Sequence, residues 1–471
     1  MFAATWPRAT EAVPQMTTDT RKSFLGTPAT APGPEGPAML RQFGRIRRDP
    51  LQYLAATWRE YGDIVQFPIP RPPSYLVCDP GAVRSVLVAD SKSYGKSTIQ
   101  YRSLSLVTGD GLLVADTEPW RRQRPLVQPA FHHETLEAIV AHIDVALQRM
   151  YAQWDALPAG AVTDIDEAMM HAALEVVGHA LFGTDLSADA ERLATATLSA
   201  LDVVIARARV PITPPSWMPT PANRKLQASV RELDAAVRGM MLERRGGRGH
   251  VPADMLDLLL GARDDSGAGL TPREVRDEVV TFIVAGHETV ASALTWAWAL
   301  VAGHPEVQEE LQRESDAVLG GRAPTFADYA RLPYARAVFD EALRLYPPAW
   351  LITRKALDDA VLGGHDVPRG SLVILSPWIV HRHPDVWPEP ERFLPSRFLD
   401  GSASRTSFIP FGAGLRQCIG RDFAYVEGTL MLSSIAGRYA LAYPPGRGVP
   451  AAAPLVTIRP VGGLPLRITR R

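Results

Sequence analysis

The stretch FGAGLRQCIG (residues 411–420) holds one of only two cysteines in a chain of 471 residues. Its three glycines permit tight turns and a close approach of the backbone to a bound group. Apolar residues recur at helical spacing from Ile419 onward, so a helix is expected to begin just after Cys418. Free N–H groups at the start of that helix can stabilise negative charge on the sulfur. The loop therefore suits a thiolate ligand, with Phe411 as a shield from water and Arg416 as a partner for an anionic group.

The surroundings of Cys418 in the sequence argue against zinc. Zinc sites use three or four protein ligands, usually in close pairs, and no other cysteine or histidine lies within twenty residues of Cys418. A metal with one protein ligand must bring its other ligands with it, as haem iron does. The alternative is a buried free cysteine without chemistry. The loop alone leaves these two possibilities open.

The composition is that of a soluble globular protein, with 46% hydrophobic and 21% charged residues. A net charge of −1 indicates no general attraction to nucleic acid or to an anionic membrane. Two cysteines cannot form a disulfide framework, which favours a reducing, cytoplasmic location. We expect no signal peptide or membrane anchor at the N-terminus. Residues 279–303 are long enough to span a bilayer, but a central acid costs roughly 2.5–3.5 kcal/mol there, so we predict a buried core helix.

The order of patterns along the chain predicts a mainly α fold with a small β-rich portion drawn from both ends (α+β). A Pro- and Gly-rich stretch suggests a flexible lead-in over residues 1–38, followed by a single domain over 39–471. Thr271 and Pro272 are a typical helix start. The predicted strands lie within 63–69, 74–79 and 360–377, helices dominate from about 115 to 345, and the tail (455–468) is expected to form a small hairpin.

The long apolar helix contains AGHET (residues 285–289). Ala285 and Gly286 have almost no side chain, so a flat ligand could approach the helix backbone there. Thr289 can donate a hydrogen bond to the carbonyl of Ala285 and bend the helix. Together with the acid Glu288 it would make a small polar notch for water and proton delivery. The alternative is an ordinary packed helix whose Thr caps a carbonyl and whose Glu pairs with an arginine.

Residues 411–420 and 285–289 together resemble the cytochromes P450, the haem-thiolate monooxygenases. FGAGLRQCIG matches the family signature F-x-x-G-x-R-x-C-x-G at every fixed position, and AGHET matches the oxygen-activation motif A/G-G-x-D/E-T. The resemblance implies a haem b group between the long central helix and the cysteine loop, with Cys418 as the axial iron ligand. A thiolate in this role favours O–O cleavage. It also implies that Thr289 holds water and bound dioxygen, and that Glu288 feeds protons.

The family's buried charged triad is implied at Glu341, Arg344 and Arg397. Glu341 and Arg344 match E-x-x-R, although most pairs of this spacing are exposed and contribute little. The third member follows from F-x-P-x-R-F at residues 393–398, which selects Arg397 rather than the Arg392 of the literal PERF. Ser396 stands where the family often has Glu. The role implied for the triad is structural, to hold the cysteine loop.

Further matches imply the residues that bind the haem and the substrate. Trp120 and Arg124 match W-x-x-x-R, which binds a haem propionate in the family, and Arg354 and Arg416 match two further propionate contacts. Such pairing is physically sound because charge-assisted hydrogen bonds are the strong ones. The resemblance also implies cofactor contacts from Phe411 and Gly420, and a substrate pocket lined by Leu113, Ala285, Thr289, Ala349 and Val456.

The activity that the resemblance implies is insertion of one oxygen atom from O2 into an apolar substrate, by hydroxylation or epoxidation of a lipid, terpenoid, steroid or polyketide. Residues 200–225, with prolines at 211, 214, 215, 219 and 221, would form a mobile roof. Electrons would come from a ferredoxin with its ferredoxin reductase, or from a flavodoxin, bound near Cys418. A cationic docking face is expected from arginines that could equally be ordinary solvated residues: Arg121, Arg122, Arg405 and Arg421.

We expect a monomer that binds no nucleic acid. Rival functions are a haem-based gas sensor, a peroxide-driven relative and a membrane protein.

Overall fold

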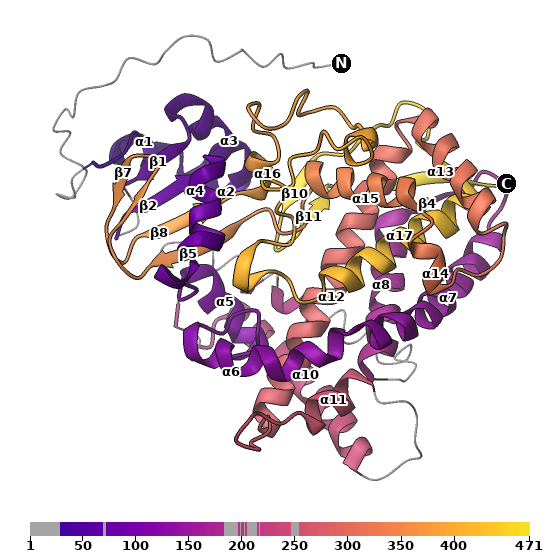
Figure 1. Ribbon diagram of the computed structural model, residues 1–471, viewed down its shortest axis with the longest axis horizontal. Helices are drawn as coiled ribbons and strands as arrows, with labels where there is room; N and C mark the ends of the chain where they lie inside the picture. Colours follow the sequence, from indigo (N-terminus) through magenta and orange to yellow (C-terminus); the bar gives the residue numbers. More distant parts are fainter. Residues whose placement is uncertain are drawn as a thin grey trace.

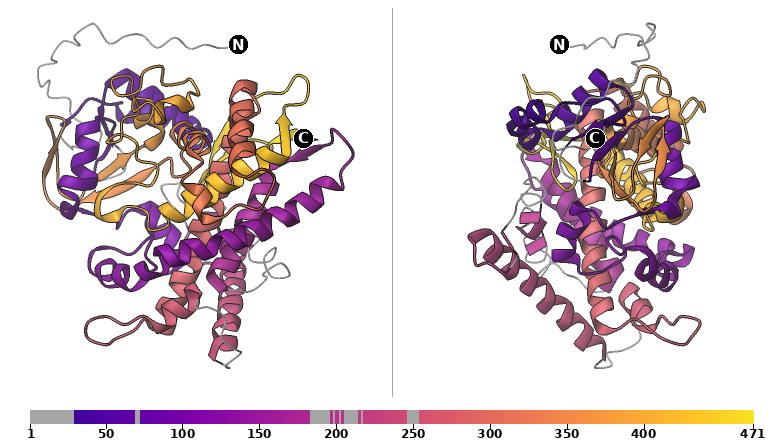
Figure 2. Two further views of the ribbon diagram at one scale, coloured as in Figure 1. Left: turned by 45° about the vertical axis from the view of Figure 1, so that its right-hand side comes forward. Right: turned by 90° about the vertical axis from the view of Figure 1, so that its left-hand side faces the viewer.

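The structure is a computed structural model that describes residues 29–68, 72–182, 196–197, 199–201, 203–204, 214–215, 217–245 and 254–471. A five-stranded sheet lies at one side of a helical body (Figures 1 and 2). The helices are α1 Gly36–Arg41, α2 Phe43–Arg48, α3 Pro50–Tyr61, α4 Pro80–Arg84, α5 Ile99–Thr108, α6 Thr117–Val127, α7 His133–Asp155, α8 Ile165–Phe182, α10 Pro221–Arg245, α11 Met255–Gly261, α12 Pro272–Val301, α13 Pro305–Val318, α14 Phe326–Tyr329, α15 Pro333–Leu345, α16 Pro377–Val380 and α17 Arg421–Arg438.

The strands come from both ends of the chain, as the sequence predicts. Strand order in the large sheet is β1-β2-β8-β5-β3; β2 and β8 are parallel and the other pairs antiparallel. Figure 1 shows the indigo strands of the N-terminal segment beside the orange strands that follow residue 350. The strands are β1 Ile64–Phe67, β2 Ser74–Val77, β3 Tyr94–Gly95, β4 Val162–Asp164, β5 Ile352–Ala356, β6 Ala360–Leu362, β7 His365–Val367, β8 Leu372–Leu375, β9 Tyr439–Ala442, β10 Ala452–Pro454, β11 Ile458–Pro460 and β12 Pro465–Arg470.

The hairpin predicted for the tail is wrong. β11 pairs with β10, whereas β12 pairs with β4 and β9 in a separate sheet. Residues 461–464 between them, with Gly462 and Gly463 at positive φ, therefore carry the chain from one sheet to the other. A local turn pattern cannot reveal this, because the pairing partners lie far away in the sequence.

Helix α12 is the core of the helical body and begins as predicted. Thr271 and Glu274 form a capping box: the Thr271 hydroxyl accepts from the Glu274 N–H, and the Glu274 carboxylate accepts from the Thr271 N–H. Among the described residues α12 is the one helix apolar and long enough to cross a membrane, and 83% of its most apolar window is buried in the protein. It packs on α8, α15 and α17. These contacts support the prediction of a buried core helix.

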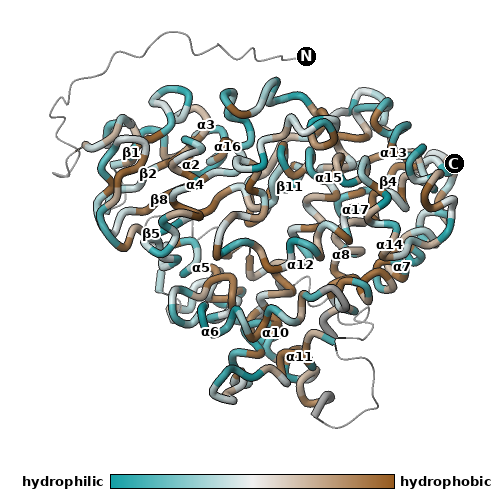
Figure 3. Tube along the Cα trace, in the orientation of Figure 1, coloured by the Kyte–Doolittle hydropathy of each residue, from teal (hydrophilic) through white to brown (hydrophobic). Residues whose placement is uncertain are grey.

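Gly286 of α12 lies against helix α8. A Cβ on Gly286 would lie 3.1 Å from Val177 of α8. The missing side chain therefore lets α8 approach α12 on this side, while Gly286 itself is only partly buried; that a flat ligand approaches the backbone at Ala285 and Gly286 stays a prediction. Figure 3 shows hydrophobic residues through the helical body and along the sheet, and hydrophilic residues in the outer loops.

The N-terminal segment contacts the sheet from residue 30 onward. Thr30 donates its N–H to Gln66 Oε1 at 2.7 Å and shares a hydrogen bond with the Tyr75 hydroxyl at 2.7 Å. The division of the chain at residue 38 stays a prediction. Residues 202, 205–213 and 216 of the predicted roof (200–225) lie outside the described residues. The end of the roof leads into α10, where the Asn223 amide donates to the carbonyls of Pro215 and Met218.

Candidate functional site

The cysteine loop is a tight turn fitted against its neighbours. The Cys418 N–H donates to the Phe411 carbonyl at 2.9 Å and closes the loop. Gly412 and Gly414 have φ near +66° and +67°, a region that favours glycine. A Cβ on Gly414 would also lie 2.2 Å from the Leu87 carbonyl oxygen. Helix α17 begins at Arg421, three residues after the cysteine, close to the expected start.

The two cysteines lie in opposite surroundings. Cys78 is fully buried, whereas Cys418 is exposed. Burial nevertheless raises the pKa of the Cys418 thiol, while the Gly420 N–H and nearby cations, Arg124 first among them, act in the opposite direction. Cys418 is therefore accessible, although enough protein surrounds it for loss of solvent to raise the pKa of its thiol. A buried inert thiol does not fit this arrangement.

A cluster of cations lies beside the cysteine loop. Arg124 donates to the Gln417 carbonyl at 3.1 Å. Arg416 donates to the Ala115 carbonyl at 2.6 Å, and its guanidinium lies 4.1 Å from the centre of the Trp120 ring. Arg354 is buried and donates to the Thr353 carbonyl at 2.9 Å. Three of the cations bond backbone carbonyls, which leaves their charge largely uncompensated.

Lys96 is a member of this cluster that sequence reasoning missed. It is 7% exposed and donates to the Leu113 carbonyl at 2.6 Å. Burial, then repulsion from Arg354 and Arg416, holds the pKa of Lys96 well below its usual value. Burial and Arg354 also lower the pKa of Arg416 to about 10. The sequence SKSYGKS (residues 91–97) has no pattern that distinguishes this lysine from an exposed one, so Lys96 is recognised as a candidate site residue by its burial in the structure.

The positive charges in this cluster outnumber the negative ones, so the cluster is suited to bind an anion. Asp116 is the acid that opposes the cations in both pKa shifts, and it lies 3.8 Å from Arg416. Like charges in partly buried surroundings repel each other strongly. A bound dianion, such as a pair of carboxylates, would relieve that repulsion and bring Lys96 and Arg416 toward their ordinary pKa values.

Helix α12 presents a short accessible patch in the middle of an otherwise buried run. From Asp277 to Val301 every residue is buried except Ala285, Gly286 and Thr289. The Thr289 hydroxyl donates to the Ala285 carbonyl at 2.6 Å, as predicted. Glu288 is buried, and its Oε1 accepts from the Thr457 hydroxyl at 2.9 Å. Thr289 is thus accessible to a ligand, while its acidic neighbour is turned toward the β10–β11 turn.

The charged triad has the geometry that the motifs imply. Glu341 and Arg344 are both completely buried and form a two-point ion pair with N···O distances of 2.7 Å. Arg397 Nε lies 3.1 Å from Glu341 Oε1. Arg344 also donates to the carbonyls of Pro390 and Arg392, so Arg392 takes part only through its backbone. Its side chain pairs on the surface with Glu389.

The segments that carry the predicted pocket residues are tied to one another. Leu113, Ala285, Ala349 and Val456 are all at least partly exposed. The Leu112 N–H donates to both oxygens of Glu278 on α12 at 3.1 Å. The indole of Trp350 donates to the Leu455 carbonyl at 3.0 Å, and Thr457 reaches Glu288. Neighbours of three predicted pocket residues thus anchor their segments on α12 or on each other.

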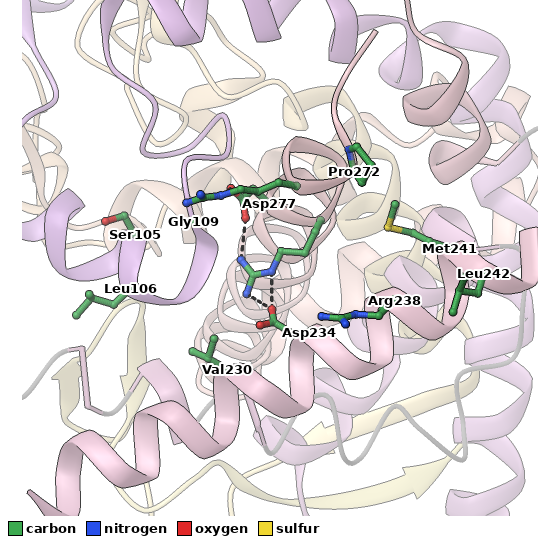
Figure 4. A pocket seen from close by; sticks show the side chains of 12 residues that line it. Ser105, Leu106, Gly109, Val230, Asp234, Arg238, Met241, Leu242, Pro272 and Asp277 are labelled. Carbon is green, nitrogen blue, oxygen red and sulfur yellow. Dashed lines mark hydrogen bonds and ion pairs between the residues drawn. The ribbon is translucent and has the colours of Figure 1, made fainter. Parts of the chain in front are cut away.

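A pocket of about 590 Å³ lies away from the cysteine loop, between α5, α10 and the start of α12 (Figure 4). Arg276 crosses it, pairing with Asp234 of α10 at 2.6 Å and with Asp277 at 2.9 Å. Asp277 in turn accepts from the Asp110 N–H at 3.0 Å. This chain of bonds joins α10 to α12 and to the loop before Leu113.

A second hollow, of about 530 Å³, borders the cysteine loop; Phe411, Gln417 and Arg421 are among its lining residues. Three of the four arginines predicted for partner docking form ion pairs within the chain. Arg122 pairs with Glu274 and donates to the Gly269 carbonyl, and Arg421 pairs with Asp422 at 2.8 Å. Arg121 pairs with exposed Glu118, and Arg405 is exposed. Arg122 therefore fits the alternative of an ordinary structural arginine better than a docking role.

A family model for cytochrome P450 matches residues 31–463. The chain belongs to the cytochrome P450 family. It is a haem-iron monooxygenase, and the α-rich fold with its small sheets is the fold of that family. The residues present fit a haem: an exposed thiol in a closed loop, an accessible patch on the long helix, and a cation cluster suited to two carboxylates.

Named relatives cover nearly the whole cytochrome P450 domain. The chain is 37% identical over 409 residues to cyclooctatin synthase of Streptomyces melanosporofaciens, covering 85% of this chain and 87% of that protein. It is 36% identical to cyclooctat-9-en-7-ol 5-monooxygenase of the same organism, covering 89% and 91%. It is 34% identical to pentalenene oxygenase of Streptomyces avermitilis, covering 94% and 97%.

Proposed function

We propose that this cytochrome P450 hydroxylates or epoxidises a terpenoid hydrocarbon or alcohol. The observation that carries the proposal is similarity over most of the chain to a cyclooctatin synthase and to two oxygenases, which are named for cyclooctat-9-en-7-ol and pentalenene. Such skeletons are apolar, and the candidate pocket residues Leu113, Ala285, Ala349 and Val456 are apolar too. Lipids, steroids and polyketides, which the sequence alone left open, become alternatives for the same test.

Cys418 is proposed as the axial ligand of a haem b group. Trp120, Arg124, Arg354 and Arg416 would bind its propionates, with Lys96 as a further partner. Phe411 would shield the sulfur, and Gly420 would supply an N–H that lowers the pKa of the thiol. When bound, haem supplies the activation of O2, one oxygen atom entering the substrate and the other leaving as water.

Thr289 and Glu288 are proposed to deliver protons. Because the Thr289 hydroxyl gives its hydrogen to the Ala285 carbonyl, its oxygen is free to accept a hydrogen bond from a water molecule. Glu288, buried beside it, would pass protons from solvent to that water. The triad of Glu341, Arg344 and Arg397 would hold the segment before the cysteine loop in place, a structural role.

Electrons are proposed to come from a ferredoxin with its reductase, or from a flavodoxin, bound near Cys418. The hollow beside Phe411, Gln417 and Arg421 supports this location. Arg121, Arg405 and Arg421 remain the candidates to meet an acidic partner. Replacing Arg405 and Arg421 by Glu is expected to slow ferredoxin-driven turnover at low ionic strength. Turnover equal to wild type would remove this face from consideration.

The chain is further proposed to act as a cytoplasmic monomer. Size-exclusion chromatography with light scattering and fractionation of cell extracts test these two points. A dimer, or recovery with the membrane fraction, would contradict them.

The experiment for the proposed function has two stages. The reduced protein with carbon monoxide should show the red-shifted band of thiolate-ligated haem, and Cys418→Ala should lack it. Pentalenene, a diterpene alcohol, a steroid and a fatty acid are then titrated while the haem spin state is followed. The terpenoids should bind best and should be oxidised with NADPH and surrogate redox proteins. Tighter binding and faster oxidation of the steroid or fatty acid would overturn the substrate class, and turnover driven only by peroxide would favour the peroxide-driven alternative.

A further inference from the structure

The β10–β11 turn (residues 455–457) and the start of β11 are fastened to α12 by three side chains. Ser292 and the indole of Trp296 both donate to the Ile458 carbonyl, at 2.6 and 2.9 Å. The Thr457 hydroxyl donates to Glu288 Oε1 at 2.9 Å. The first two bonds hold the backbone of β11 against the helix. The third is of another kind, because it joins two side chains and one of them is the candidate proton donor.

The hydrogen bond between Thr457 and Glu288 is buried, and burial increases its effect on the carboxyl group. Glu288 is 4% exposed and Thr457 is 2% exposed, so water has little access to the carboxylate from this side. A buried carboxylate is costly unless it receives hydrogen bonds. Glu288 has interactions besides this one, so the hydroxyl contributes to its surroundings and is not its sole support.

Two ionisable residues close in sequence to this bond, Arg459 and His287, are paired or neutral. Arg459 of β11 pairs with Asp166 of α8 at 2.7 Å. Burial, and then the charge of Arg459, lowers the pKa of His287 to about 4, so this histidine is neutral near pH 7. His171 of α8 is the remaining titratable group that acts on His287. The Thr457 hydroxyl is a polar group that β10–β11 offers directly to the Glu288 carboxyl.

We propose that Thr457 is a positioning residue for Glu288, an inference that rests on the proton-delivery role proposed for Glu288. A hydroxyl both donates and accepts. It can donate to the carboxylate and, after rotation of its own hydrogen, accept from the protonated acid. Thr457 therefore keeps Glu288 in one orientation while a proton arrives from solvent and leaves toward the water at Thr289. Valine, of nearly the same shape, can do neither.

The position of Thr457 adds a link to the substrate. It follows Val456, a candidate pocket residue, in a turn whose ends are paired at Pro454 and Ile458. A substrate that presses on Val456 would act on the same short turn that holds the acid. Proton delivery would in this way depend on how the pocket is filled.

The test compares Thr457→Val, Thr457→Ser and the matched control Ser292→Ala in the haem-loaded enzyme. Ser292→Ala removes a bond between the same two elements without touching Glu288. Product formed per NADPH consumed is expected to fall about three- to tenfold in Thr457→Val, less than the ~10²-fold or more that loss of a general acid can cost. The solvent isotope effect should rise. Thr457→Ser and Ser292→Ala should resemble wild type. Should Thr457→Val not accumulate as folded protein, Thr457→Ala makes the same comparison.

A readout independent of turnover is the infrared absorption of the Glu288 carboxyl, identified by difference from Glu288→Gln. Its titration midpoint should rise by about one pH unit in Thr457→Val, because both forms lose a hydrogen bond and the bond to the charged carboxylate is the stronger of the two. An unshifted midpoint, or equal loss of coupling in Ser292→Ala, would overturn the inference. Its failure differs from failure of the proposed function: if Glu288→Gln itself leaves coupling and isotope effect unchanged, the proton-delivery role falls.

Discussion

Arg397 Nε lies 3.1 Å from Glu341 Oε1, and both side chains are buried. Arg397 also donates to the carbonyls of Pro388 and Glu389, so it ties the helix of Glu341 to the segment that leads to the cysteine loop. Removing one partner leaves a buried carboxylate only partly compensated, which costs about 3–5 kcal/mol in comparable cases.

Arg397→Gln is accordingly expected to lower the free energy of unfolding by about 3 kcal/mol and to reduce the yield of haem-loaded protein. Arg392→Gln is the control: this arginine lies five residues earlier, and its exposed side chain pairs with Glu389 on the surface. It should change stability by less than about 0.5 kcal/mol. Urea unfolding of both variants checks the difference, and similar losses would show that the two arginines are not distinguished by burial.

Lys96→Met is expected to weaken haem retention without destabilising the haem-free protein. The lysine is buried near Arg354 and Arg416, so its charge is unfavourable until an anion binds. Transfer of haem to an acceptor protein should be several-fold faster, while the melting temperature of the apoprotein should stay the same or rise. Lys92→Met, at an exposed position, controls for loss of a lysine. Unchanged haem transfer would exclude Lys96 from the propionate site.

Because of Glu278, we expect the free energy of unfolding to fall as the pH rises. Burial raises the pKa of Glu278 to about 8, above its unfolded value of about 4.3. The folded state therefore holds this proton more tightly than the unfolded state does. The contribution of protonated Glu278 to the free energy of unfolding is fully present below about pH 4.3 and is lost as the pH rises toward 8. Glu278→Gln can still accept the Leu112 N–H and should lack this decline, differing from wild type by about 1.4 kcal/mol per pH unit at most.

Urea unfolding at pH 5, 7 and 9 measures this difference between Glu278→Gln and wild type. Glu310→Gln, at a solvent-exposed ion pair with Arg313, serves as control. Parallel curves for Glu278→Gln and wild type would show that Glu278 is ionised in the folded protein at neutral pH.

Because of His381, we expect the free energy of unfolding to fall as the pH is lowered below neutral. Its Nε2 accepts from the Ile409 N–H at 2.9 Å, and its Nδ1 lies 3.2 Å from the Arg344 carbonyl oxygen, an arrangement for a neutral ring. Burial, and then the charge of Arg344, lowers the pKa of His381 to about 3. The unfolded histidine titrates near 6.5. The contribution of the neutral His381 ring to the free energy of unfolding is therefore fully present above about pH 6.5 and is lost progressively as the pH falls from 6.5 to 3.

His381→Gln should be less stable than wild type at pH 7 yet lose less stability between pH 7 and pH 5. His365→Gln, at a partly exposed position, should leave the pH dependence as in wild type. Urea unfolding at the two pH values makes the comparison. An equal pH slope in wild type and His381→Gln would mean that this ring does not resist protonation.

Sequence reasoning succeeded where the relevant partners are close in the chain. The bond from Thr289 to Ala285 spans one helical turn, and the pair Glu341–Arg344 spans three residues, so spacing alone brings each pair together. The capping box at Thr271 and Glu274 is local for the same reason. Arg397 was assigned through a family pattern, because nothing in its own neighbourhood distinguishes it from Arg392.

Sequence reasoning failed where the outcome depends on which distant segments pack together. The tail, predicted as one hairpin, divides between two sheets with separate partners. Lys96 became a site residue only because its segment is buried beside Arg354 and Arg416. No pattern in the sequence reports any of these neighbours.

By itself the sequence determined the family, the thiolate loop, the helical notch at Ala285 and Thr289, and the order of the motifs along the chain, since each of these is encoded by residue types at short fixed spacings. Only the tertiary structure decided that Lys96 joins the cations beside the cysteine loop and that Thr457, 169 positions from Glu288, donates to its carboxyl. Contacts of that kind arise from the packing of distant segments around a common core, because burial and the hydrogen bonds it requires select their neighbours, and spacing along the chain does not.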